Sequence, residues 1–215
     1  MPRLTEEEEL KRQAEMWELE NGIHAAGHQL IAGVDEAGRG PLAGPVYAAA
    51  VILPEGARLD GINDSKKLSP KKREELFEKI TEIAVSYAVF AVDEKEIDEI
   101  NILNATHKAM NQAVNSLNVK PDYVIIDGNS INGMSLPHET VVKGDAKSIS
   151  IAAASILAKV ARDRYITEMA EKYPEYGFEK HKGYGTKAHT DAILKHGVCP
   201  IHRRTFLKKL LGEKL

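Results

Sequence analysis

Cysteine is nearly absent from this chain of 215 residues, because Cys199 is the only one. A single cysteine cannot form an internal disulfide. Long apolar runs are missing too: none has the length of a signal peptide or a membrane-spanning helix, and residues 5–22 are acidic. These absences predict a cytoplasmic protein that does not bind a membrane.

Several motifs of common site types are also missing. The chain has no G-x-x-x-x-G-K-[ST] sequence, no internal repeat, no low-complexity segment and no Cys/His cluster that would suggest zinc. The sequence HAAGH, residues 24–28, has the histidine spacing of a metal site. It lacks the glutamate of a zinc protease and contains Gly27, so we interpret both histidines as structural.

The net charge of −3 gives no strong indication of a partner, but its distribution is uneven. Residues 1–127 hold 14 Lys and Arg against 23 Asp and Glu, a balance of −9, and residues 128–215 hold 15 against 9, a balance of +6. Such asymmetry can mark a basic surface that binds phosphates. Solvated lysines on helices produce the same count more often, so charge alone favours that simpler interpretation.

Composition and pattern predict one α/β domain at residues 28–215, with a mixed sheet, helices on both faces and C-terminal helices. A helical extension is expected at residues 1–27, where Thr5 and Glu8 form a capping-box pattern. Strands are expected at residues 28–35, 44–54, 86–93, 121–128 and 138–145. Helices are expected at residues 5–22, 68–80, 101–119, 148–173 and 186–197, and in the closing segment 202–215.

Three acids lie at the ends of expected strands: Asp35, Asp127 and Asp145. In open α/β sheets, sites form at the carboxyl ends of strands, where neighbouring carboxylates repel each other unless a cation joins them. Asp145 precedes a helix, so it could instead be a helix cap. Glu36 follows Asp35 directly, and neighbouring residues of a strand point to opposite faces. The two can share a site only if the chain leaves the pleat between them.

Gly38 and Gly40 would give the chain that freedom. They would also let backbone N–H groups approach a phosphate, with Arg39 adding charge. A dinucleotide-binding loop is the competing interpretation. It fits poorly, because the spacing of GRGPLAG is one residue too long and the next segment, residues 44–54, has the pattern of a strand.

Six motifs occur in an order that resembles ribonuclease HII of the bacterial type. They are GVDEAGRGPLAGP, NDSKKLS, VIIDG, VKGDAKS, ASILAKVARDR and HKGYGTKAH, between about residues 30 and 203. The resemblance implies the ribonuclease H fold with a central five-stranded mixed sheet. It also implies hydrolysis of the RNA strand of RNA–DNA hybrids and cutting at single ribonucleotides in duplex DNA, which leaves 5′-phosphate and 3′-hydroxyl ends. Such an activity serves ribonucleotide excision repair and DNA replication.

The family's four catalytic acids correspond to Asp35, Glu36, Asp127 and Asp145. Carboxylates suit Mg²⁺ or Mn²⁺, and two such ions can activate water and stabilise the leaving 3′-oxygen. We expect Asp35 to bridge the ions, Glu36 and Asp127 to serve the leaving-group side, and Asp145 the nucleophile side.

The resemblance also implies that Gly38, Arg39 and Gly40 contact the ribose 2′-hydroxyl, and that Tyr184 packs on the next, deoxy, sugar. Lys66 and Lys147 are expected phosphate contacts. Tyr184 could instead be a plain loop aromatic. We interpret Lys67, Lys71, Lys72 and Arg73 as a solvated helix face, and Lys159 with Asp163 as a structural ion pair.

Two other function classes stay open: a non-catalytic hybrid-binding module, and another metal-dependent enzyme of the same fold such as a transposase or junction resolvase. The related ribonuclease HIII has lysine where this chain has Arg39, and carries an added N-terminal domain, so it is disfavoured. The expected partners are RNA–DNA hybrids and duplexes containing ribonucleotides. We expect a monomer, and the sequence leaves open whether a replication clamp binds the segment FLKKLL.

Overall fold

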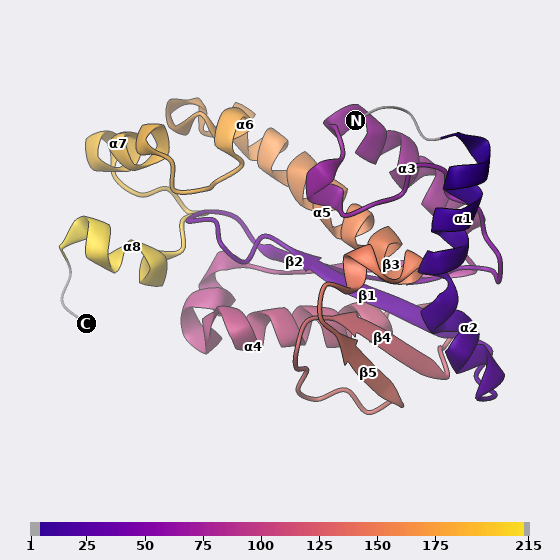
Figure 1. The fold of residues 1–215 in the computed structure, drawn as a ribbon. Helices are drawn as coiled ribbons and strands as arrows, with labels where there is room; N and C mark the ends of the chain where they lie inside the picture. The colour runs from indigo at the N-terminus through magenta and orange to yellow at the C-terminus, as the bar shows by residue number, and fades with distance from the viewer. Residues whose placement is uncertain (1–4, 213–215) are drawn as a thin grey trace.

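The computed structural model describes residues 5–212 and has a five-stranded sheet at its centre, in the order β3-β2-β1-β4-β5 (Figure 1). The strands are β1 Ile31–Ala37, β2 Val46–Ile52, β3 Ser86–Val92, β4 Tyr123–Asp127 and β5 His138–Val141. β1 pairs antiparallel with β2 and parallel with β4. The predicted five-stranded mixed sheet is confirmed.

Eight α-helices surround the sheet within the described residues. They are α1 Glu6–Met16, α2 Glu18–Ala25, α3 Pro70–Ile83, α4 Glu94–Asn115, α5 Ile149–Lys172, α6 Phe178–His181, α7 Lys187–His196 and α8 Arg204–Leu211. Short 3-10 helices are η1 Ser65–Lys67, η2 Gly144–Ala146 and η3 Pro174–Tyr176. Over residues 5–212, none of the helices combines the length and hydropathy needed to cross a membrane. The ends of the predicted extension and closing segment, residues 1–4 and 213–215, lie outside the described part.

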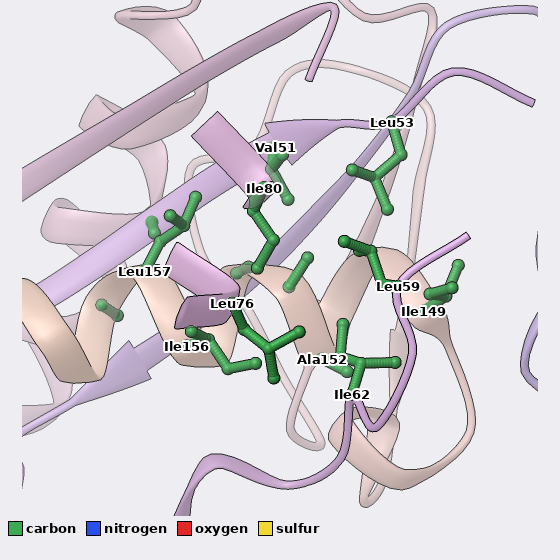
Figure 2. Close-up of a cluster of buried hydrophobic side chains, with 14 of the residues drawn as sticks. Val51, Leu53, Leu59, Ile62, Leu76, Ile80, Ile149, Ala152, Ile156 and Leu157 are labelled. Atoms are coloured by element: carbon green, nitrogen blue, oxygen red, sulfur yellow. The ribbon is translucent and has the colours of Figure 1, made fainter. Parts of the chain in front are cut away.

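Alternate residues of β1 and β2 pack on opposite faces of the sheet, as the two-residue period of a strand requires. On one face, Val34 and Ala48 belong to a buried cluster completed by α4. On the other face, Ala49 and Val51 pack with residues of α3 and α5. Figure 2 shows the second cluster, where Val51 and Leu53 lie opposite side chains from both helices. The helices predicted on both faces are therefore confirmed.

Gly33 lets α5 lie close to the central strand. A Cβ atom added at this glycine would lie 2.2 Å from the backbone carbonyl carbon of Ser150, in the first turn of α5. No side chain fits that space, so glycine allows the direct contact of helix and strand. Because η2 precedes α5 by a few residues, this contact also brings η2 towards the sheet.

The N-terminal helices join the same core. Met16 and Trp17 belong to the cluster on the α5 face, and the Trp17 indole N–H donates to the carbonyl of Ala57 at 3.2 Å. Glu20 is buried, and its Oε1 accepts from the Ser148 hydroxyl at 2.6 Å and the Ser150 N–H at 3.0 Å. α2 therefore contacts the start of α5 directly.

Helix caps agree with the sequence at several positions. The capping box of Thr5 and Glu8 forms, and Ser69, Ser148 and Thr186 accept hydrogen bonds from the first turns of α3, α5 and α7. These side chains satisfy N–H groups that have no partner within their helices. The predicted starts of these helices are confirmed to within one or two residues.

Three boundaries differ from the prediction. The N-terminal helix is interrupted at Trp17, where tertiary packing holds the indole. The helix expected from residue 101 begins at Glu94, and Asn101 breaks it with φ 67°, its side chain capping the second half. The strand expected to reach Asp145 ends at Val141, and Asp145 lies in η2. The N-cap of α5 is Ser148, so interpreting Asp145 as that cap is wrong.

Two buried histidines connect the segment after α6 to the segment before α8. The Cys199 N–H donates to His202 Nδ1 at 2.9 Å, and His202 Nε2 lies 3.0 Å from His189 Nε2. His189 Nδ1 lies 2.9 Å from the carbonyl oxygen of Tyr184. A carbonyl only accepts, so His189 carries its proton on Nδ1, and His202 donates from Nε2. Both histidines must be neutral for all of these hydrogen bonds to form.

Burial lowers the pKa of His189 to about 4, and burial together with His189 lowers the pKa of His202 to about 4. Unfolded histidine titrates near pH 6.5, so between these values the unfolded chain binds more protons. We expect the free energy of unfolding to fall by about 2–3 kcal/mol as the pH falls through this window. Urea unfolding from pH 7 to 4.5 measures it. His202→Gln should show a shallower fall than the wild type and the exposed-site control His196→Gln; equal slopes would contradict the assignment.

Candidate active site

Asp35 and Glu36 lie in β1, near its carboxyl end. The prediction that the chain leaves the pleat between them is wrong, because β1 stays paired with β2 as far as Ala37. Its pairing with β4 already ends at Val34. The β4 side of β1 is therefore free of strand pairing beside both acids. Both acids lie at this end of the sheet, and the charge of Glu36 raises the pKa of Asp35.

Asp127 and Asp145 come to the same end from β4 and from η2, which follows β5. Asp127 is the last residue of β4, which lies parallel to β1. The Gly144 N–H donates to Asp127 Oδ1 at 2.7 Å and so ties η2, which contains Asp145, to the end of β4. The four predicted acids are thus brought together from β1, β4 and η2.

Burial and neighbouring charges raise the pKa values of Asp35, Glu36 and Asp145. Burial, followed by the charges of Glu36 and Asp127, holds the pKa of Asp35 well above its usual range. Burial also raises the pKa of Glu36, although Arg39 opposes the shift, and burial with nearby carboxylates raises the pKa of Asp145. In each case, like charges in a poorly hydrated place disfavour the ionised form.

The acids fit a hard divalent cation in charge and in donor chemistry. Asp35 is only 5% exposed, and of the four only Glu36 forms an ion pair among the described residues, with Arg39 at 3.5 Å. Carboxylate oxygens are the ligands that Mg²⁺ and Mn²⁺ prefer. Within residues 5–212, however, no three His, Cys, Asp or Glu side chains are already arranged to hold one ion. The acids share one end of the sheet without forming a closed ligand set.

A cavity of about 280 Å³ opens beside Glu36. Its lining includes five of the predicted substrate contacts: Gly38, Arg39, Gly40, Lys66 and Tyr184. They come from the chain after β1, from η1 and from the segment after α6. The structure therefore gathers residues that are far apart in the sequence around one opening.

Lys66 lies close to the acids. Burial opposes its charge, but Asp35, Asp64 and Asp145 outweigh that effect and raise the pKa of Lys66. Lys147 lies elsewhere: it lines a separate cavity of about 680 Å³ with Lys67, next to α1 and α2. Of the two lysines predicted as phosphate contacts, only Lys66 shares the cavity of Tyr184.

Residues 38–45, named here the 38–45 turn, contribute Gly38, Arg39 and Gly40 to the lining of the cavity. Gly38 has φ +96°, and a Cβ atom there would lie 2.1 Å from Arg162 Nε. A Cβ atom at Gly40 would lie 3.6 Å from Tyr184 Cε1, so the tyrosine ring faces this glycine. The Leu42 N–H donates to the Gly183 carbonyl at 2.8 Å, which joins the turn to the Tyr184 segment.

Sequence reasoning missed several residues at this end of the sheet. Ser155 opposes the rise in the pKa of Asp35, and its hydroxyl lies 3.0 Å from that of Ser65. Lys159 also lines the cavity, and its predicted ion pair with Asp163 is confirmed at 2.7 Å. His107 lines a small neighbouring cavity of about 40 Å³ with Glu36, Arg39 and Asp127. The spacing of residues 155, 159 and 162 on one helix face was the available signal.

Arg73 corrects one further interpretation. It is not part of a solvated face: its guanidinium donates to the carbonyls of Ser65 and Leu68 at 3.0 and 2.7 Å and pairs with Asp163 at 3.5 Å. These contacts hold η1, the segment that carries Lys66. Ser65 and Leu68 lie 8 and 5 residues before Arg73, whereas Asp163 lies 90 residues after it and meets Arg73 only in the folded chain.

Comparisons with known proteins agree with this geometry. The sequence model of the family described as ribonuclease HII matches residues 32–209. The ribonuclease HII of Acetivibrio thermocellus is 55% identical over 97% of this chain and 82% of its own. The crystal structure of ribonuclease H2 from Pyrococcus horikoshii has a TM-score of 0.71 at 34% identity, and covers 84% of this chain and 96% of its own. The RNase HII of a PCNA:RNase HII complex from Archaeoglobus fulgidus has a TM-score of 0.69 at 31% identity, covering 81% and 93%. The predicted ribonuclease H fold is thereby confirmed.

The repulsion among the acids leads to a prediction that can be tested without measuring catalysis. Asp35→Asn should stabilise the metal-free protein at pH 8 by about 1–2 kcal/mol, because a neutral amide removes a buried charge beside two others. Millimolar Mg²⁺ or Mn²⁺ should raise the melting temperature of the wild type but not of this variant. Thermal unfolding with and without metal measures both effects. Glu55→Gln, which removes an exposed acid away from the site, serves as the control, and an equal metal-induced rise in Asp35→Asn would rule out Asp35 as a ligand.

Proposed function

The chain belongs to the ribonuclease HII family, whose members cleave the RNA of RNA–DNA hybrids, and we propose that it also cuts duplex DNA at single embedded ribonucleotides. The products would carry 5′-phosphate and 3′-hydroxyl ends. The observation that carries the proposal is the cavity beside Glu36. Gly38, Arg39, Gly40 and Tyr184, from segments far apart in the chain, line it together at the end of the sheet where the acids gather.

For the chemistry, we propose that Asp35, Glu36, Asp127 and Asp145 hold divalent cations. Bound Mg²⁺ or Mn²⁺ would activate a water molecule and stabilise the leaving 3′-oxygen. The charges of the acids support this role, since three of the four have raised pKa values that a cation would lower. The Glu36 N–H donates to Asp35 Oδ1 and the Gly144 N–H donates to Asp127 Oδ1, and these bonds orient the two carboxylates.

For substrate recognition, the 38–45 turn and Tyr184 would contact two successive sugars of the substrate strand. Backbone groups of Gly38–Gly40 would bond to the ribose 2′-hydroxyl, which alone distinguishes RNA from DNA at one nucleotide. The Tyr184 ring, 45% exposed, would pack on the sugar of the next, deoxy, nucleotide. Lys66 is placed to bind the phosphate near the acids, and Lys147 would bind phosphate farther along the duplex.

A clamp contact is not part of the proposal. The relative from Archaeoglobus fulgidus was solved as a PCNA complex. In this chain, the FLKKLL segment forms most of α8, where Leu207 is buried and Phe206 and Leu210 pack against core residues. These apolar side chains are used within the protein itself, so they are not free for a partner unless α8 detaches.

Cleavage assays separate the proposal from the other function classes. In Mg²⁺, the wild type should cut a duplex with one ribonucleotide and an RNA–DNA hybrid, but not the all-DNA duplex. Asp127→Asn should lower the rate by roughly a thousandfold or more while binding persists, because a lost metal ligand affects the transition state most. Glu55→Gln, an exposed acid, should cleave like the wild type. Binding without cleavage by the wild type would favour a binding module, and cutting of all-DNA duplexes or junctions would favour a transposase or resolvase.

Substitution of Tyr184 tests whether the protein recognises a ribonucleotide that is followed by a deoxyribonucleotide. Loss of its stacking contact is worth ~1–3 kcal/mol, so Tyr184→Ala should cut a single embedded ribonucleotide roughly ten- to a hundredfold more slowly. Cleavage inside a long hybrid should fall less, because the next sugar there carries its own hydroxyl. Tyr184→Phe keeps the ring and should retain most of the activity on both substrates. Equal losses on the two substrates in Tyr184→Ala would mean that the tyrosine is only a scaffold.

A further inference from the structure

Two arginines are buried beneath the 38–45 turn, Arg162 with 1% and Arg203 with 0% of the side chain exposed. Within residues 5–212, neither forms an ion pair within 4.0 Å; their partners are backbone carbonyls. Such complete burial of a guanidinium is rare and costs free energy unless its N–H groups are satisfied. Each arginine uses all three of its nitrogens in hydrogen bonds to the main chain.

Arg203 binds the turn at the glycine–arginine–glycine element itself. Its Nη2 donates to the carbonyl of Gly38 at 2.6 Å, its Nη1 to the carbonyl of Arg39 at 2.9 Å, and its Nε to the carbonyl of Gly44 at 2.8 Å. Two consecutive peptide groups are therefore held by one rigid planar fork. The guanidinium is suited to this because its donors keep a constant relative orientation.

The orientation of these carbonyls determines the direction of the neighbouring N–H groups. In a planar trans peptide the N–H points opposite to the C=O, so the N–H groups of Arg39 and Gly40 point away from Arg203. Neither N–H donates to an acceptor among the described residues, and both residues line the cavity beside Glu36. The Leu42 and Gly44 N–H groups, in contrast, donate to the carbonyls of Gly183 and Ile201.

Arg162 holds a different part of the turn. Its Nη2 donates to the Ala43 carbonyl at 3.0 Å, its Nε to the Pro45 carbonyl at 3.3 Å, and its Nη1 to the Lys182 carbonyl at 3.1 Å. Arg162 thus joins the end of the turn to the segment that leads to Tyr184. It forms no hydrogen bond with the Gly38 or Arg39 carbonyls.

We propose that Arg203 is a positioning residue that aims the Arg39 and Gly40 N–H groups at the ribose 2′-hydroxyl. The inference rests on the proposed function. Simple packing would not need buried charge, because apolar residues fill such a place at lower cost in free energy. The Arg39 and Gly40 N–H groups point in a fixed direction only if the carbonyls of the same two peptide groups are held. The Arg203 guanidinium holds both carbonyls with two of its nitrogens.

The test compares Arg203→Lys with Arg162→Lys, a matched control that loses an equally buried fork with three carbonyl contacts. Each variant keeps its positive charge, but an ammonium cannot hold the same carbonyls together. Binding is measured in Ca²⁺, which supports little turnover, for duplexes with and without one ribonucleotide. The wild-type preference for the ribonucleotide should shrink roughly three- to tenfold in Arg203→Lys, the value of about one hydrogen bond. The preference should change less than about twofold in Arg162→Lys. Both variants should unfold at a lower temperature than the wild type.

The outcomes are distinct. An unchanged preference in Arg203→Lys, or equal losses in both variants, would overturn the positioning role and leave Arg203 as a structural residue. A wild type that neither prefers nor cleaves the ribonucleotide-containing duplex would contradict the proposed function before any variant is made. These two failures are therefore distinguishable.

A measurement on the wild type covers the case in which the variants fail to fold. In amide NMR spectra of the ¹⁵N-labelled protein, the Arg39 and Gly40 N–H groups should exchange rapidly with solvent, and those of Leu42 and Gly44 slowly. Adding the ribonucleotide-containing duplex in Ca²⁺ should shift the Arg39 and Gly40 signals beyond the shift caused by the all-DNA duplex. Protected Arg39 and Gly40 amides in the free protein, or identical shifts with the two duplexes, would refute the inference.

Discussion

The packing of α5 against β1 is the constraint on which the rest of the site depends. Gly33 allows the first turn of α5 to touch the central strand, and the helix then runs beneath the site for its whole length. Its start follows η2 and Asp145, its first half supplies Ser155 beside Asp35, and Arg162, just past its midpoint, binds the 38–45 turn. One straight helix therefore sets the relative positions of the acids and the turn, and a shift of its contact with β1 would displace both.

The same packing explains why the acids are destabilising without a cation. Because α5 and the sheet exclude water, Asp35 is almost fully buried, and this burial together with the neighbouring carboxylates raises the pKa of Asp35. A protein selected for stability alone would have neutral residues at this end of the sheet. Retaining the charges is expected where catalysis needs them, since strain and unfavourable charge are concentrated at functional sites.

The segments after α5 act chiefly as support for the 38–45 turn and for Tyr184. Arg203 and Arg162 hold the carbonyls of the turn, and the neutral pair of His189 and His202 holds the carbonyl of Tyr184. In both arrangements a buried polar side chain orients the main chain of a segment that lines the cavity, at Gly38 to Gly40 and at Tyr184. Recognition by backbone groups is accurate only if those groups are held from behind, and this explains buried charge so close to the surface.

The sequence alone determined the strands and the helix caps, because these follow from local signals: period-two burial and a serine or threonine before a helix. It proposed Asp35, Asp127 and Asp145 as site residues from their places at the ends of expected strands, and Glu36 through the family motifs. It also indicated that Gly38, Arg39, Gly40, Lys66 and Tyr184 belong together, through the family motifs. The tertiary structure decided that β1 stays paired past Glu36, that Asp145 lies in η2 and not in a strand, and that Lys147 faces another cavity. It also revealed the roles of Arg73, Ser155, Arg162 and Arg203. Arg73, Ser155, Arg162 and Arg203 each have at least one partner more than 80 residues away in the chain, such as Gly38, which lies 165 residues before Arg203. Local patterns carry no information about such distant partners, because only the folded chain brings them together.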